Sequence, residues 1–180
     1  MSYCRIAPGH PLHGRYHDRE YGFPVSDEAP LFERLVLEIN QAGLSWTTIL
    51  AKRDNFRTAY DQFAVDRVAS YGLRELGRLM KDAGIVRNRL KINAAVENAR
   101  RIRELRASHG SFAGWLAGHH PLSKPEWVKL FKKTFAFTGG EITGEFLLSI
   151  GYLPGAHDES CPIYAKIKRL KPPWMDARPS

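Results

Sequence analysis

The sequence is poor in cysteine, with two in 180 residues, and it has no apolar run near the roughly 20 residues that a membrane-spanning helix needs. Residues 1–22 carry Arg, His, Pro and Asp where a signal peptide has its apolar core. We therefore expect a cytoplasmic protein without membrane association. In that compartment two cysteines favour core packing, reactivity or metal ligation over a structural disulfide.

Acidic residues are also in the minority: 19 Asp and Glu stand against 27 Lys and Arg, so the formal net charge is +8. This excess argues against an acidic-surface enzyme and favours an anionic partner, nucleic acid first and a membrane surface second. With 43% hydrophobic residues over this length, the chain can form one domain with a substantial core.

The sequence shows no clear pair of β-strands, no fixed-period repeat and no low-complexity segment, whereas apolar residues recur at helical spacing through most of it. The pattern predicts an all-α, multi-helix domain over residues 1–162. A basic tail follows, residues 163–180, which has little to pack and is expected to be loosely ordered. The predicted helices are 27–42, 46–53, 55–63, 66–71, 73–82, 88–107, 111–117, 124–135 and 141–150.

The stretch LVLEINQAGLSW, residues 35–46, places a carboxylate among the buried positions of a predicted helix. Glu38 follows Leu31 by seven residues and Leu35 by three, so the three side chains share one side of the helix and Glu38 points inward. That position is costly, because the carboxylate loses hydration and faces the unfavourable end of the helix dipole. Glu38 is therefore either a structural acid paired inside the protein or a functional group whose partner is a ligand.

A second motif, KKTFAFTGGEITGEF over residues 132–146, predicts two helices joined by a turn through Thr138, Gly139 and Gly140. Such a hairpin exposes backbone N–H groups at a helix N-terminus and can bind a phosphate of the DNA backbone without reading sequence. A plain tight turn is the alternative. Glu141, in the first turn of the second helix, favours the helix dipole but would repel a phosphate.

The two cysteines lie at opposite ends of the chain, each near a histidine, with spacings C-x12-H and H-x3-C. Two thiolates and two imidazoles suit a closed tetrahedral zinc site, which would be structural because no open coordination position remains. Unligated cysteines and surface histidines are the alternative, and His10 and His13 compete for the second position. The candidate ligands are Cys4, His17, His157 and Cys161.

Four spaced motifs and the two Cys/His pairs together resemble the 3-methyladenine DNA glycosylase I family, in order from residue 4 to about residue 161. The motifs are YHDREYG (16–22), LEINQAGLSW (37–46), KDAGIVRNRLKI (81–92) and FAFTGG (135–140). The resemblance implies an all-α helix–hairpin–helix fold and a monofunctional hydrolase of base-excision repair that flips 3-methyladenine out of duplex DNA and releases it. It also implies one structural Zn²⁺ ion, which would join the two ends of the domain; we expect a monomer.

The resemblance gives Glu38 a partner: in the family the matching Glu accepts hydrogen bonds from the extruded base. Aromatic residues matching Tyr16 and Trp46 line the pocket, and we expect Tyr21 and His13 to contribute to substrate binding. Methylation at N3 makes the purine cationic, and an aromatic cage with a carboxylate favours a cation over neutral adenine. Because the alkylated base already leaves readily, positioning and electrostatics suffice for catalysis.

The resemblance also implies two DNA contacts. The turn through Gly43, Leu44 and Ser45 matches the family's DNA-probing loop, with Leu44 as the wedge that fills the vacated stack. The hairpin turn through Thr138, Gly139 and Gly140 would hold the phosphate backbone.

Several positions depart from the family pattern. The family carries other, aromatic residues at the positions of Ile6, His13 and Tyr21. It usually carries Tyr and Ser at the positions of Gly144 and Glu145. Ile6 and His13 remove stacking surface, and Glu145 adds a second carboxylate near the site if it faces inward. The lesion therefore stays open among 3-methyladenine, 3-methylguanine and another cationic base.

Two alternatives concern the activity itself. Asp158 falls near the place where many helix–hairpin–helix glycosylases carry a catalytic Asp, but a solvated acid beside a metal ligand is the default there. A non-catalytic DNA-lesion-binding module of the same fold would explain the charge and the hairpin without explaining an inward Glu38.

Overall fold

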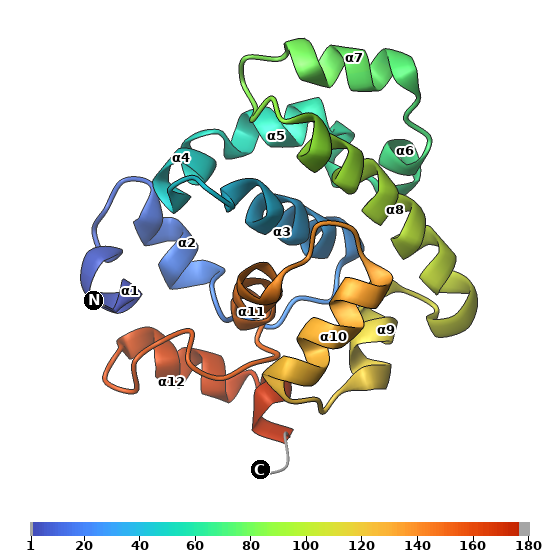
Figure 1. Ribbon diagram of the computed structural model, residues 1–180. Helices are drawn as coiled ribbons and strands as arrows, with labels where there is room; N and C mark the ends of the chain where they lie inside the picture. The colour runs from blue at the N-terminus through green and yellow to red at the C-terminus, as the bar shows by residue number, and fades with distance from the viewer. Residues whose placement is uncertain (1, 177–180) are drawn as a thin grey trace.

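The computed structural model describes residues 2–176, and all regular structure in that range is helical, as the all-α prediction requires (Figure 1). Short 3₁₀ turns occupy Asp61–Phe63 and Pro173–Asp176. The α-helices are α1 Tyr3–Ile6, α2 His13–Arg19, α3 Glu28–Gln41, α4 Trp46–Ala51, α5 Arg53–Ala59, α6 Val65–Ala69, α7 Leu73–Lys81, α8 Arg89–His109, α9 Phe112–His119, α10 Lys124–Thr134, α11 Gly140–Ser149 and α12 Pro162–Arg169.

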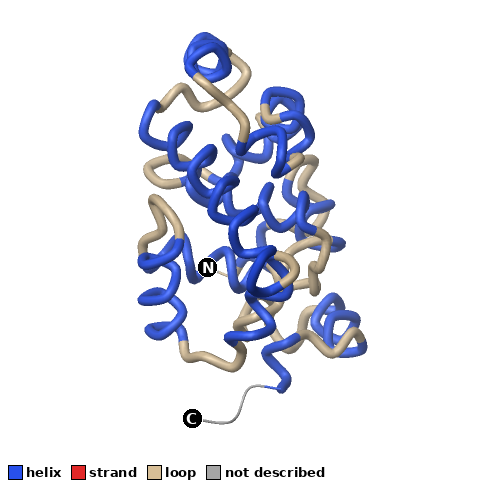
Figure 2. Tube along the Cα trace, turned by 90° about the vertical axis from the view of Figure 1, so that its right-hand side faces the viewer, coloured by secondary structure: helices blue, strands red, loops and turns tan. Residues whose placement is uncertain are grey.

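Helix α3 runs through the middle of the molecule and packs against α4, α8, α9 and α11 (Figure 1). Its apolar residues recur every three or four positions, and Leu31, Leu35 and Ile39 are fully buried. The same periodicity buries Glu38, as predicted from the sequence. Figure 2 shows the surrounding helices from the side, joined by short loops. None of the described helices has the length and apolar character needed to cross a membrane.

The expected loosely ordered tail is wrong for residues 163–176, because α12 and a 3₁₀ turn occupy most of that segment. Ile163 and Ile167, one turn apart, are buried and pack with Cys161 in a small cluster of their own. The chain then continues to Trp174, whose backbone N–H donates to Gly151. Residues 177–180 of the tail lie outside the described residues.

Two helices near the N-terminus, α1 and α2, have no counterpart in the sequence-based prediction. Each is too short for a clear periodic signal; Ser2 caps α1, whereas α2 starts without a side-chain cap. They lie at the edge of the molecule near α12 (Figure 1), where Cys4 and His17 meet His157 and Cys161.

Candidate functional site

The burial of Glu38 is the central feature of the site. Its side chain is 5% exposed, and among the described residues no group forms a hydrogen bond with its carboxyl oxygens. Burial, and secondarily the negative charge of Glu145, raise the pKa of Glu38 to about 8, while Arg34 opposes the shift. The buried acid therefore has no internal partner that accounts for it.

Glu38 faces a cavity of about 440 Å³ where α1, α2, α3, α4 and α11 meet. A cavity of this size accommodates a small planar ligand. Three of its side chains are the aromatic residues predicted from the sequence. The cavity is lined by Tyr3, Ile6, His13, Tyr16, Tyr21, Glu38, Gln41, Trp46, Thr47 and Glu145.

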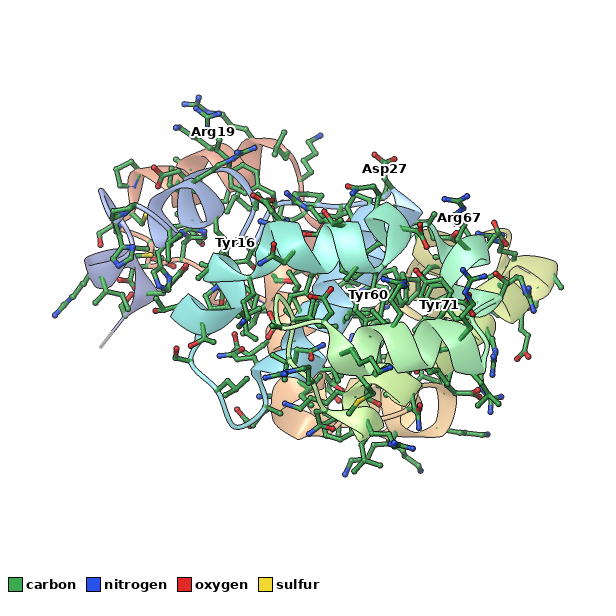
Figure 3. The ribbon with its side chains drawn as sticks, turned by 90° about the horizontal axis from the view of Figure 1, so that it is seen from above. Tyr16, Arg19, Asp27, Tyr60, Arg67 and Tyr71 are labelled. Carbon is green, nitrogen blue, oxygen red and sulfur yellow. The ribbon has the colours of Figure 1, made fainter. Side chains whose placement is uncertain are left out.

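Aromatic rings from three segments form one wall. Tyr16, labelled in Figure 3, lies on α2. Its ring centroid lies 5.2 Å from that of Trp46 on α4 and 5.7 Å from that of Tyr21. The guanidinium groups of Arg34 and Arg53 lie 5.4 and 5.7 Å from the Tyr16 ring centroid and fix its position by cation–π contact. This wall offers flat faces to a planar ring.

A hydrogen-bonded chain forms another wall. Tyr3 Oη lies 3.0 Å from His13 Nδ1, and His13 Nε2 lies 2.8 Å from Thr47 Oγ1. Burial lowers the pKa of His13, so the imidazole is neutral and its two nitrogens can serve one as donor and one as acceptor. His13 therefore lines the cavity as a fixed polar surface. Ile6 also lines it and remains 52% exposed.

Glu145 faces inward. It projects from α11 into the cavity, where it accepts a hydrogen bond of 3.3 Å from Tyr21 Oη. Burial raises the pKa of Glu145 as well. Gly144 leaves room for Lys124, because a Cβ atom at that position would meet the end of the Lys124 side chain.

The four Cys and His side chains proposed from the sequence form one cluster, with ligand atoms all within 4.8 Å of one another. Cys161 Sγ lies 3.8 Å from His17 Nε2 and 3.7 Å from His157 Nδ1, and Cys4 Sγ lies 3.5 Å from the same His157 atom. The cluster joins α1 and α2 to the start of α12, so it can hold a metal ion between the two ends of the chain.

The remaining nitrogens of both histidines have their own partners. His17 Nδ1 lies 2.7 Å from Asp18 Oδ1, and His157 Nε2 lies 2.8 Å from the backbone oxygen of Tyr21. Such contacts orient imidazole ligands and leave the opposite nitrogens free for a metal. Asp158 belongs here and does not line the cavity: its backbone N–H donates to Cys4 Sγ.

The loop between α3 and α4 places Leu44 at the surface, 43% exposed. Gly43 has a φ of +81°, a conformation that favours glycine, and Ser45 caps α4 by accepting from the Thr48 backbone N–H. Lys91, buried on α8, donates to carbonyl oxygens at the end of α3 and so holds the base of this loop.

The turn between α10 and α11 carries the two glycines of the predicted hairpin. Gly139 is the N-cap of α11, and a Cβ atom on Gly139 or Gly140 would meet nothing within 4 Å. Thr138 is buried and its hydroxyl donates to the Phe135 carbonyl. Neither packing nor a positive φ requires glycine at these two positions, and the backbone there is open to close approach from outside.

Sequence reasoning missed three cavity residues, Tyr3, Gln41 and Thr47, and the loop-holding Lys91. Tyr3 gave no signal because α1 was not predicted. Gln41 follows Glu38 by three positions on one helix face, a spacing that could have indicated it.

Fold and site together define a helical protein that can hold a flat, positively charged ring between aromatic faces and a buried acid. A family model described as methyladenine glycosylase matches residues 6–128. The DNA-3-methyladenine glycosylase 1 of Escherichia coli (strain K12) is 34% identical, covering 91% of this chain and 97% of that protein. The DNA-3-methyladenine glycosylase of Haemophilus influenzae is 32% identical over 82% of this chain and 89% of its own.

A solved structure of a 3-methyladenine DNA glycosylase I is also similar to this chain. A crystal structure of a Tyr-to-Phe variant of 3-methyladenine DNA glycosylase I in complex with 3-methyladenine matches with a TM-score of 0.80 and 28% identity, covering 91% of this chain and 97% of that one. The chain belongs to the methyladenine glycosylase family.

Proposed function

We propose that this protein is a DNA-3-methyladenine glycosylase of base-excision repair, which flips N3-methylated adenine out of duplex DNA and hydrolyses its glycosidic bond. The observation that carries the proposal is Glu38, a buried acid in an aromatic cavity that has no hydrogen-bond partner within residues 2–176. The extruded cationic base supplies the missing positive charge and hydrogen-bond donors. Tyr16, Trp46 and Tyr21 provide the stacking faces, and His13 supports the polar wall.

The cavity residues lower the activation barrier for cleavage of the glycosidic bond by positioning the base and by their charge. Glu38 holds the base at the aromatic wall while the bond between the sugar and the base breaks and positive charge moves to the sugar. A water molecule then attacks the sugar, and no lyase step is needed. The methylated base leaves without protonation, so no general acid is assigned.

Two surface elements bring DNA to the cavity in this proposal. Leu44 enters the stack vacated by the flipped base, supported by Gly43 and Ser45. The turn through Thr138, Gly139 and Gly140 binds backbone phosphate, and the open space around both glycines supports close approach. We also propose that the enzyme acts as a monomer in the cytoplasm; its relatives are bacterial DNA glycosylases, which supports the compartment.

The metal cluster suits a structural zinc ion. Zinc–sulfur bonds of about 2.3 Å and zinc–nitrogen bonds of about 2.0 Å in a tetrahedron separate S and N by about 3.5 Å. The S···N distances of 3.5 to 3.8 Å fit that geometry. Cys4, His17, His157 and Cys161 would fill all four positions, so the ion would support the fold and leave the chemistry to the cavity.

Chromatography of bases released from methylated duplex DNA tests the proposal. We expect release of 3-methyladenine by the wild-type protein and none by Glu38→Ala at the same concentration. Binding to methylated DNA without release of any base would instead support a non-catalytic lesion-binding module. Release of 3-methylguanine in the same chromatogram would define the wider lesion range.

A further inference from the structure

The cavity contains a second carboxylate. Glu145 on α11 and Glu38 on α3 line the same 440 Å³ space, and both also border an adjoining hollow that contains Glu141. Acidic groups are thus concentrated at one place in a protein whose net charge is +8. Carboxylates gathered around one cavity suit the binding of a positively charged ligand.

Glu145 has one hydrogen-bond donor and one cation near it. Tyr21 donates to Glu145 Oε2 at 3.3 Å, and Gly144 allows the side chain of Lys124 to cross α11 next to it. The two carboxyl groups repel each other when both are ionised, and this adds to the desolvation cost that raises the pKa of Glu38. Among nearby cations, Arg34 acts on Glu38 and Lys124 on Glu145, and neither forms a hydrogen bond with these carboxylates within the described chain.

We propose that Glu145 is a specificity-determining residue that, together with Glu38, makes the cavity select positively charged purines over neutral purines. A cationic base offsets the negative charge of both carboxylates when they ionise, but a neutral base does not. This inference rests on the proposed function, since it concerns the same cavity. It adds a charge contact from α11 that the Glu38 assignment does not include.

Two small molecules that differ by the N3 methyl group and its positive charge test this selectivity, and the Glu145 variants isolate the contribution of charge. The 3,9-dimethyladeninium ion carries the N3 methyl group, the positive charge and a methyl group in place of the sugar, and 9-methyladenine is its neutral counterpart. Isothermal titration of each against the wild-type protein gives the selectivity for the cation. We expect Glu145→Gln to weaken binding of the cation about tenfold, the size of one charge-assisted contact, and to leave the neutral base nearly unchanged.

Glu104→Gln is the matched control, because it removes the same charge from an exposed position on α8 that lines neither the cavity nor the adjoining hollow. We expect it to change the selectivity by less than about twofold, since salt screens an exposed charge. Glu145→Ser provides a second variant if Glu145→Gln does not fold, and the same loss is expected. Equal selectivity in wild-type protein and Glu145 variants, or an equal loss in Glu104→Gln, would overturn the inference.

The outcomes for the two proposals are distinct. A wild-type protein that discriminates the two compounds through Glu145 but releases no base from methylated DNA contradicts the proposed function and supports this inference. A protein that releases 3-methyladenine from DNA and keeps its selectivity for the cation after Glu145→Gln supports the proposed function and contradicts this inference. A wild-type protein that binds neither compound overturns the inference.

Discussion

Glu38 has a pKa of about 8, so at neutral pH its carboxyl group is mostly protonated in the empty cavity. Arrival of a cationic base changes this balance, because a positive charge in contact with the group favours the ionised form. The aromatic wall of Tyr16 and Trp46 attracts a cation through its ring faces but carries no negative charge to neutralise it. Recognition of the cation and ionisation of Glu38 are therefore coupled.

Replacing Glu38 by Gln tests this residue directly. The substitution preserves volume and removes the electrostatic cost, so the fold should be kept, but the amide has neither the charge nor the acceptor pattern of the carboxylate. Loss of one charge-assisted hydrogen bond costs about 1.5 to 3 kcal/mol, which is roughly ten- to a hundredfold in rate if expressed in the transition state. Single-turnover release of 3-methyladenine measures it. An unchanged rate in Glu38→Gln would defeat the assignment.

The raised pKa of Glu38 also predicts how stability depends on pH. The folded protein binds the proton more tightly than the unfolded chain does, so between the ordinary glutamate value of 4.5 and about pH 8 the folded state holds more protons. The contribution of Glu38 to the free energy of unfolding is therefore greatest below pH 4.5, and it is lost as the pH rises to about 8. Urea melts at pH 5, 7 and 8.5 should show a decline in wild-type protein that is reduced in Glu38→Gln. Equal slopes in both proteins would mean that the acid is not buried in solution.

At the level of secondary-structure elements, the end of α3 is tied to α8 just before the loop that is proposed to probe DNA. Lys91, 5% exposed, donates through Nζ to the carbonyl oxygens of Asn40 at 2.9 Å and Ala42 at 2.5 Å. A cation at a helix C-terminus is favoured by the helix dipole, and these bonds satisfy carbonyl groups that the helix leaves unpaired. The loop that carries Leu44 starts directly after them.

Replacing Lys91 by Met should therefore loosen the loop while sparing the cavity. Leaving these carbonyl oxygens unpaired costs about 1–3 kcal/mol of stability. We expect excision from duplex DNA to fall about tenfold or more, while binding of 3,9-dimethyladeninium changes little. Lys166→Met, which removes the same charge from an exposed position on α12, is the control and should retain wild-type excision. Equal losses in both variants would indicate a general charge effect instead.

The hairpin between α10 and α11 gives a prediction about DNA affinity. A side chain added at Gly140 meets open space in the protein, so Gly140→Val should fold normally and obstruct only an approaching phosphate backbone. Binding to damaged and undamaged duplexes should weaken by the same factor, about tenfold, and salt should weaken wild-type binding steeply. Fluorescence anisotropy with labelled duplexes measures both. Gly77→Val, at another glycine with open space, should bind DNA like wild-type protein.

At the scale of the whole molecule, helical periodicity in the sequence predicted most of the helices, but it did not predict how the N-terminal helices pack against the segment around α12. Strong periodicity on α3 was enough to predict that Glu38 is inward, because burial of one helix face follows from sequence spacing. The two Cys/His pairs are separated by most of the chain: their spacings made the four residues candidate ligands, and the family resemblance implied that the pairs meet. The helices α2 and α12 are short, and tertiary contacts around that cluster stabilise them, so the expected loose tail was wrong. The direction of Glu145 likewise depends on how α11 packs against α3.

The four Cys and His side chains give the last prediction, because they join segments that bury few apolar side chains between them. Cys4 and His17 come from α1 and α2, while His157 and Cys161 precede α12. Only a few buried apolar residues pack next to these four side chains. We expect one zinc ion per chain in protein purified without added metal, measured by elemental analysis. Since metal affinity contributes to folding free energy, removal by a chelator or by Cys161→Ser should destabilise the protein by several kcal/mol. At about 2–4 °C per kcal/mol for a domain of this size, the melting temperature should fall by about 10 °C. His109→Ala, which removes an exposed histidine outside the cluster, should melt like wild-type protein. Wild-type stability in zinc-free protein would show that packing alone joins the two ends.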